Sequence, residues 1–91
     1  MKTVSVGIPT FNESANIKKL VQSLLDQHQS GFKLDSIIVS DDDSTDGTQS
    51  IVYSIKNSKI LLLKNKKREG IAKRLNQIFN VCKSDYLLIL N

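Results

Sequence analysis

Four short apolar runs alternate with three stretches of helical periodicity along the 91 residues, and this alternation restricts the fold more than any other feature. The apolar runs have the length and β-branched content of buried strands, and they lie at residues 3–8, 36–40, 60–63 and 85–90. The order β-α-β-α-β-α-β predicts a mostly parallel sheet covered by helices, with right-handed crossovers. We therefore expect an α/β chain, a Rossmann-like three-layer sandwich. Because the last run stops at the ligand edge of such a sheet, we expect residues 1–91 to be the amino-terminal portion of a larger domain.

The first helical stretch carries its apolar residues at i, i+3, i+4, i+7 and i+8, the pattern of one buried face, and these are Ile17, Leu20, Val21, Leu24 and Leu25. We expect Asn12 or Ser14 to cap the start of this helix and Ser30-Gly31 to end it.

The second helix is predicted from Ser44 or Thr45 to Lys56, and the third begins near Gly70. The predicted inward-facing residues of these two helices are Ile51, Val52, Ile55, Ile71, Leu75, Ile78, Phe79 and Cys82.

Composition narrows the class of protein and its compartment. The chain is 40% hydrophobic and 24% charged with a net charge of +4, which suits a phosphate-bearing ligand or an anionic membrane surface. A single Cys82 excludes an internal disulfide and fits a reducing compartment. The apolar run after Met1 ends at Pro9, shorter than a secretory signal requires, and no stretch is long enough to span a bilayer. We therefore expect the cytoplasm, or the cytoplasmic face of a membrane. The lone His28 is expected to bind no metal.

An acidic run directly follows the second predicted strand and contains Asp41, Asp42 and Asp43. Ligands of open α/β sheets bind at the carboxyl ends of the strands. Crowded carboxylates also repel one another unless a ligand, cation or backbone N–H compensates. The run therefore predicts a binding site, in which Asp42 accepts hydrogen bonds from a base imide or a ribose hydroxyl, or lies near a metal.

The end of the acidic run has a local role. Ser44 and Asp46 are predicted to cap the second helix, with Gly47 relaxing the backbone.

Two further loops are predicted at the same edge of the sheet. Residues 9–13 offer the flat face of Phe11 to a base, and Asn12 and Glu13 supply polar atoms at a helix start. Residues 64–70 are basic and precede a helix whose amino terminus also favours anions. A loop of carboxylates facing a loop of cations suits a nucleotide.

Several familiar motifs are absent from the sequence. It contains no G-x-G-x-x-G, no G-x-x-x-x-G-K-[ST] and no Cys/His pair with zinc spacing. Asp41-x-Asp43-x-Thr45 matches the D-x-D-x-T loop of haloacid-dehalogenase-like phosphatases, in which Asp41 would be the nucleophile and Asp43 the acid/base. That family usually has this loop after its first strand, whereas here a complete strand–helix unit comes before it. This alternative and a non-catalytic nucleotide-binding module both remain open.

Four segments together resemble the nucleotide-binding half of the family 2 glycosyltransferases with the GT-A fold: VSVGIPTFNE, IIVSDDDSTDGT, REGIAKRLN and DYLLILN. The resemblance implies an inverting hexosyltransferase of cell-envelope polysaccharide assembly that uses a UDP- or GDP-linked sugar and Mg²⁺ or Mn²⁺. It implies an acceptor saccharide or polyprenyl phosphate, no nucleic acid partner, and membrane association through a later part of the chain. DDDSTDGT is also similar to dolichyl-phosphate-mannose synthases, which makes a polyprenyl phosphate a candidate acceptor, whereas the third loop fits those enzymes less well.

The resemblance assigns the nucleotide-sugar site to Pro9, Thr10, Phe11, Asn12, Glu13, Asp41, Asp42, Asp43, Arg68 and Gly70. Within that set, Pro9, Phe11 and Glu13 would line the nucleoside pocket and Asp42 would bind the base. The metal-binding D-x-D motif of the family would begin at Asn91, as in members that read N-x-D.

Two positions depart from the family pattern. Ile71 stands where a Lys is expected, so phosphate contact would fall to Arg68 or its lysine neighbours, and Asp43 stands where Gly or Asn is usual. No catalytic residue is assigned, because the catalytic base and the second metal ligand are expected beyond residue 91. We therefore expect residues 1–91 alone to bind the donor without transferring sugar.

Overall fold

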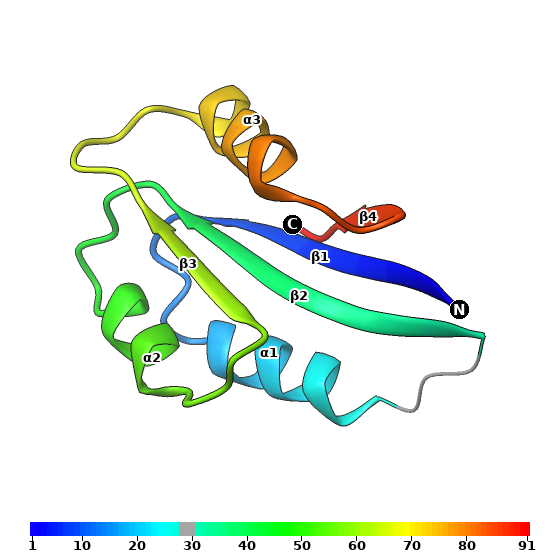
Figure 1. Ribbon diagram of the computed structural model, residues 1–91. Helices are drawn as coiled ribbons and strands as arrows, with labels where there is room; N and C mark the ends of the chain where they lie inside the picture. Colours follow the sequence, from blue (N-terminus) through cyan, green and yellow to red (C-terminus); the bar gives the residue numbers. More distant parts are fainter. Residues whose placement is uncertain (28–30) are drawn as a thin grey trace.

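A computed structural model describes residues 1–27 and 31–91 and confirms the predicted order of elements (Figure 1). These elements are β1 (Lys2–Thr10), α1 (Ile17–Asp26), β2 (Phe32–Asp41), α2 (Thr48–Ser54), β3 (Ile60–Lys64), α3 (Ile71–Val81) and β4 (Tyr86–Ile89). No helix in the described ranges combines the length and apolar character needed to cross a membrane.

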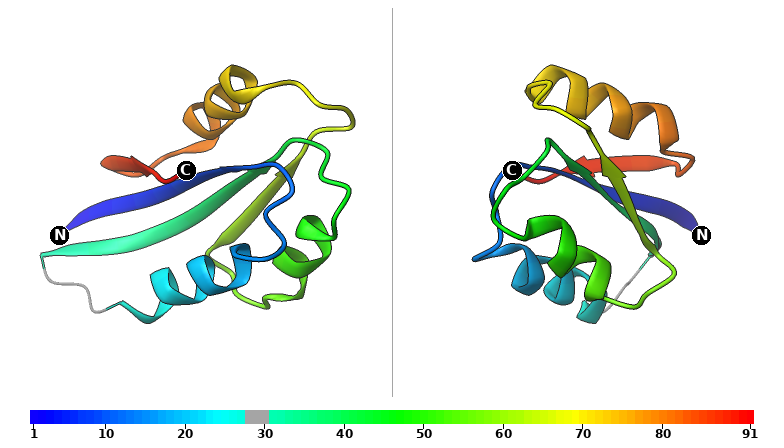
Figure 2. Two further views of the ribbon diagram at one scale, coloured as in Figure 1. Left: turned by 180° about the vertical axis from the view of Figure 1, so that it is seen from behind. Right: turned by 90° about the vertical axis from the view of Figure 1, so that its left-hand side faces the viewer.

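The four strands form one sheet in the order β3-β2-β1-β4, and all three pairings are parallel. Helices α1 and α2 cover one face and α3 covers the other, so the predicted three-layer sandwich is confirmed (Figures 1 and 2). The chain steps from β1 to β2 to β3 on one side and then crosses to β4 on the other. The strand order therefore reverses between β1 and β4, which is where ligands bind in doubly wound sheets.

The core lies on both faces of the central strands. Ile37, Ile38 and Val39 of β2 are fully buried, as a strand covered by helices on both sides requires. Ile17 and Val21 of α1 pack against the sheet from one side, confirming the predicted apolar face of that helix. The close fit of these branched side chains fixes the strand ends, where the polar loops emerge.

Two predicted helix starts were wrong, and the reason is the same for both. Helix α2 begins at Thr48, and α1 has Asn16 at its N-cap with no side-chain capping bond. The polar side chains expected at these starts bond to the neighbouring loop instead: Asn12 Oδ1 accepts a hydrogen bond from the Thr45 amide. Ser14 does not cap α1 either; its own amide donates to Asp46.

Four further predictions differ from the structure or lie outside it. Pro9 does not end the first strand but lies inside β1, opposite Ser40. In α3, Ile71 and Phe79 are 48% and 60% exposed rather than inward-facing, whereas Ile78 is fully buried as predicted. Cys82 follows α3 as its C-cap residue rather than packing within it. Helix α1 ends at Asp26, and both His28 and Ser30 lie outside the described residues.

Candidate functional site

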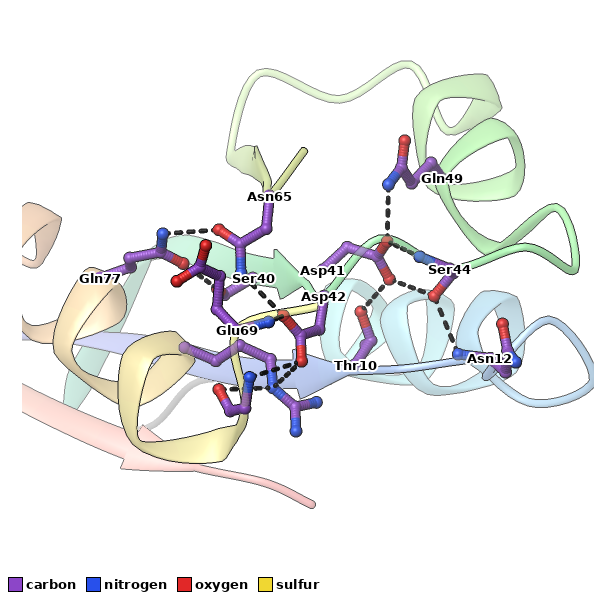
Figure 3. A network of polar contacts seen from close by, with 12 residues as sticks. Thr10, Asn12, Ser40, Asp41, Asp42, Ser44, Gln49, Asn65, Glu69 and Gln77 are labelled. Carbon is purple, nitrogen blue, oxygen red and sulfur yellow. Dashed lines mark hydrogen bonds and ion pairs between the residues drawn. The ribbon is translucent and has the colours of Figure 1, made fainter. Parts of the chain in front are cut away.

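The loops after β1 and β2 are joined by hydrogen bonds at the carboxyl edge of the sheet (Figure 3). The Asn12 amide donates to Ser44 Oγ at 2.8 Å, and the Thr45 amide donates to Asn12 Oδ1 at 2.9 Å. The Ser14 amide donates to Asp46 Oδ2 at 3.0 Å. The two loops thus satisfy each other's backbone groups, and both segments predicted to share an edge do so.

The N-cap residue of α2 is Gly47 rather than Ser44 or Asp46, and Gly47 has the relaxed backbone that was predicted for it. Asp46 still bonds to the first residue of the helix. Asp46 Oδ1 accepts a hydrogen bond from the Thr48 amide at 3.1 Å, and Gly47 has a φ of 91°. The hydroxyl of Thr48 also donates to Asp46 Oδ1, and this bond lowers the pKa of Asp46, which therefore stays ionised at the positive end of the helix. Ser44 instead donates its hydroxyl to Asp41 at 2.6 Å.

Asp41 is fully buried and bonded by four donors. Its Oδ1 accepts from the hydroxyls of Thr10 and Ser44, both at 2.6 Å, and its Oδ2 accepts from the Ser44 amide at 2.9 Å and Gln49 Nε2 at 2.7 Å. Burial alone raises the pKa of Asp41, but these hydrogen bonds outweigh it and hold the pKa below its ordinary value. A carboxylate accepts about four hydrogen bonds, so Asp41 is saturated and is not favoured as the nucleophile of a phosphatase.

Asp42 is equally buried but accepts only three hydrogen bonds from the described residues. Its Oδ1 accepts from the Glu69 amide at 2.6 Å and Asn65 Nδ2 at 2.9 Å, and its Oδ2 accepts from the Gly70 amide at 2.9 Å. Arg74 Nε lies 3.7 Å from Oδ2, an ion pair beyond hydrogen-bond distance. Burial raises the pKa of Asp42, and the bonds from Glu69, Asn65 and Gly70 lower it further than burial raises it. Oδ2 therefore keeps one acceptor position without a hydrogen bond from the described residues, in a side chain that has no exposed surface.

The third loop, residues 65–70, also contacts the first through a stacked pair. The guanidinium carbon of Arg68 lies 4.0 Å from the centroid of the Phe11 ring. Phe11 is partly buried and Arg68 is exposed. The Phe11 ring, which was predicted to stack on a base, is thus covered by the Arg68 guanidinium in this structure. A cation–π contact of this kind contributes about 0.5–2 kcal/mol.

A hollow of about 170 Å³ lies where the strand order reverses, and its lining residues are Ile8, Pro9, Thr10, Glu13, Asn16, Ile17, Leu20 and Asn91. It brings the predicted metal-binding Asn91 next to three of the predicted nucleotide-binding residues. Phe11, Arg68 and Gly70 lie at Asp42 or on the third loop and its contact with the first. Asn12 and Asp41 bond to the β2–α2 loop instead. Asp43 is exposed with a φ of 60°.

Sequence reasoning missed three polar residues that contact the two buried carboxylates, namely Gln49, Asn65 and Arg74, and it missed Gln77, which bonds to Asn65. For Asn65 a signal existed, because it is the second residue after the third apolar run and lies in the loop predicted at the ligand edge. The other three lie on helices and look like ordinary exposed-face residues in the sequence.

The pattern of glycosyl transferase family 2 matches residues 5–91. The chain belongs to this family. A UDP-Glc:alpha-D-GlcNAc-diphosphoundecaprenol beta-1,3-glucosyltransferase, WfaP of Escherichia coli, is 35% identical over all 91 residues. A GalNAc(5)-diNAcBac-PP-undecaprenol beta-1,3-glucosyltransferase of Campylobacter jejuni is 42% identical over 55 residues, 60% of this chain. The chain spans 35% of the length of WfaP. Its matched part spans 17% of the length of the Campylobacter jejuni enzyme.

Solved structures of similar proteins agree with the fold. The S. aureus TarS structure in complex with UDP-GlcNAc matches 99% of this chain and 26% of its own with a TM-score of 0.84 and 29% identity. The mannosyltransferase PcManGT from Pyrobaculum calidifontis, in complex with GDP-Man and Mn²⁺, matches 92% of this chain and 25% of its own with a TM-score of 0.80 and 28% identity. The expected partial GT-A fold is therefore confirmed.

Proposed function

We propose that the protein is an inverting hexosyltransferase and that residues 1–91 bind the nucleotide of its nucleotide-diphosphate sugar donor. One observation carries the proposal: the third loop closes on the buried carboxylate of Asp42, whose Oδ2 accepts only one hydrogen bond from the described residues, and the same loop holds Arg68 against Phe11 of the first loop. Membership of glycosyl transferase family 2 supports this proposal over a phosphatase or a non-catalytic module.

The base of the donor stacks on Phe11 in place of the Arg68 guanidinium. Base–aromatic stacking contributes about 1–3 kcal/mol, comparable to the cation–π contact that it replaces. The imide N–H of uracil, or N1–H of guanine, then donates to Oδ2 of Asp42. Both bases offer this donor at the ring edge, so the contact fits UDP and GDP alike.

The diphosphate lies over the third loop. Once displaced from Phe11, Arg68 is free to pair with phosphate oxygens, and the exposed Lys64, Lys66 and Lys67 add positive charge. The amino terminus of α3 begins directly after Gly70 and favours the same anion. This arrangement compensates for Ile71, which stands where the family usually has Lys.

The ribose side of the donor faces the hollow between the end of β1, the start of α1 and Asn91. Pro9 and Thr10 form its floor at the end of β1, and Glu13 lies at the start of the next loop. Asn12 orders this loop through its bonds to the β2–α2 loop, and the exposed Asp43 adds a further carboxylate to the β2–α2 loop.

A divalent metal fits this edge through Asn91, whose amide oxygen is the kind of hard ligand that Mg²⁺ and Mn²⁺ accept. Residues 1–27 and 31–91 contain no group of three or more His, Cys, Asp or Glu side chains placed to hold a metal. Asn91 is therefore proposed as one ligand of a larger set. When bound, the metal neutralises charge on the nucleoside diphosphate leaving group.

The relatives suggest the donor and the acceptor. WfaP and WfgD of Escherichia coli both carry UDP-Glc and diphosphoundecaprenol in their names, which favours a UDP-sugar donor and a polyprenyl-linked saccharide acceptor. Such an acceptor is held in a membrane, so we place the reaction at its cytoplasmic face, in assembly of a cell-envelope polysaccharide.

Titration calorimetry of UDP and GDP against Asp42→Ala and Asp42→Asn tests the proposal. Loss of a hydrogen bond to a charged group costs about 1.5–3 kcal/mol, so we expect affinity to fall about 10- to 100-fold. Asp26→Ala, an exposed change on α1, is the control and should bind like the wild type. Unchanged affinity in both Asp42 variants, with circular dichroism showing them folded, would contradict the assigned role.

A further inference from the structure

A chain of three hydrogen bonds runs from the sheet through α3 to Asp42 (Figure 3). The Ser40 hydroxyl donates to Gln77 Oε1 at 2.8 Å, and Gln77 Nε2 donates to Asn65 Oδ1 at 2.6 Å. Asn65 Nδ2 then donates to Asp42 Oδ1 at 2.9 Å. Ser40, Asn65 and Asp42 are buried, and Gln77 is partly buried.

The direction of donation is the same at every step, and it fixes both amides. Gln77 must turn its oxygen to Ser40 in order to present its NH₂ to Asn65. Asn65 must in turn present its own NH₂ to Asp42. If the Asn65 amide were reversed, its oxygen would face the Asp42 carboxylate, and two acceptors would meet in a buried place.

We propose that Gln77 is a positioning residue for donor binding, which acts through Asn65 to hold the Asp42 carboxylate in its ligand-binding orientation. Gln77 lies on α3, outside the loops that meet the ligand. Its effect reaches the site through the Asp42 carboxylate. Asn65, at the start of the third loop, donates to this carboxylate, and so do the amides of Glu69 and Gly70 at the end of the loop. The inference rests on the proposed function, since it names what organises that site.

Gln77→Glu is the sharpest variant because it keeps the shape of the side chain. A carboxylate at position 77 still accepts from Ser40 but cannot donate to Asn65, so the Asn65 amide turns its NH₂ to Glu and its oxygen to Asp42. We expect UDP and GDP affinity to fall about tenfold, the effect of one hydrogen bond to a charged group. Asn80→Asp, exposed on the same helix, adds the same charge outside the chain of bonds and should leave affinity within about twofold, since exposed charge changes have small effects.

A double-mutant cycle separates positioning from a general effect on folding. If Gln77 acts through Asn65, then Gln77→Glu added to Asn65→Ala should weaken binding no further than Asn65→Ala alone. Additive losses would overturn the proposal, as would wild-type affinity in Gln77→Glu while Asp42→Ala loses binding.

The chemical shifts of the Asn65 side-chain NH₂, followed by NMR of the protein without nucleotide, test the same chain of bonds independently. Gln77→Glu should move these signals, because the acceptor of the NH₂ changes from Asp42 to the new carboxylate, and Asn80→Asp should not. Failure of the wild type to bind UDP or GDP, with the Gln77→Glu effect on these signals intact, would overturn the proposed function and the role of Gln77 in binding, yet confirm its control of Asn65. Unchanged signals would overturn the positioning proposal alone.

Discussion

The carboxylate of Asp42 accepts a hydrogen bond at 2.9 Å from the backbone amide of Gly70, 28 residues further along the chain. The same carboxylate binds Asn65, at the start of the third loop, and the amide of Glu69 near its end. One buried side chain thus closes the loop at both ends. The basic residues between these points are thereby held at the ligand edge, next to Phe11.

Gly70→Ala should disturb this closure through backbone strain alone. Gly70 has φ 94° and ψ 169°, a region open essentially only to glycine, and a Cβ there would meet nothing within 4 Å. We expect a stability loss of about 1–3 kcal/mol together with weaker binding of UDP and GDP, because the backbone rotates the amide away from Asp42. Gly31→Ala, at φ 82° and also in open space, is the matched control and should lose stability only. Equal nucleotide affinities in the two variants would contradict the role of the loop.

Asp41→Asn should destabilise the protein far more than Asp43→Asn. Asn at position 41 places an NH₂ group among four donors, and each buried donor left without a partner costs about 1–3 kcal/mol. We expect the free energy of unfolding in urea to fall by about 2–4 kcal/mol. Asp43 is exposed at φ 60°, which Asn tolerates, so Asp43→Asn should stay within about 0.5 kcal/mol. Similar losses in both variants would show that Asp41 is not the structural member of the pair.

The two buried carboxylates should also make stability fall in acid. Both Asp41 and Asp42 have a folded-state pKa below the ordinary value of 3.8. A lowered folded-state pKa contributes stability that is present above the unfolded-state value and is lost as pH falls through the folded-state value. Urea unfolding between pH 7 and pH 2 should therefore show this contribution intact above about pH 5 and declining below about pH 4. Asp42→Asn should reduce the size of the acid decline, and an undiminished decline would assign it to other groups.

The sequence predicted the elements well because their signals are local. The apolar periodicity of residues 17–25 placed α1, and the acidic and basic runs placed two loops at one edge. The strand order could not be predicted in this way, because no local pattern shows that the connection from β3 to β4 passes over β2 and β1.

The errors of prediction arose where a polar side chain bonds to a distant segment rather than to its own helix. Ser44 and Asn12 looked like caps, yet they bond to each other's loops across 32 residues. In the same way Asp42 looked free for a ligand, whereas most of its acceptor capacity is used by residues 65–70. Partners at such a separation cannot be identified from spacing along one chain.

Gly7→Ala should be destabilising because α3 lies very close to β1 at this point. A Cβ on Gly7 would stand 2.6 Å from Ile78 Cγ2 and 2.9 Å from Ile89 Cδ1, and Ile78 is fully buried. Overpacking of this kind costs about 1–3 kcal/mol, which urea unfolding would measure. Ile78→Leu removes the branch methyl at nearly constant volume, so the double variant should lose less stability than the sum of the two single variants. Strict additivity would show that contact with Ile78 is not the cause.

Arg68 and Phe11 should affect nucleotide and nucleoside binding differently, because the proposed donor complex separates the two side chains. In Arg68→Gln the affinity for UDP should fall about tenfold with loss of the charge-assisted phosphate contact. Uridine, which has no phosphate, should bind as well or better, since the guanidinium no longer covers the ring. In Phe11→Leu both ligands should weaken by a similar factor, because stacking of the base is lost in each. Titration of the two ligands against the two variants by calorimetry measures all four changes. A parallel fall for UDP and uridine in Arg68→Gln would mean that Arg68 supports the base rather than the phosphates.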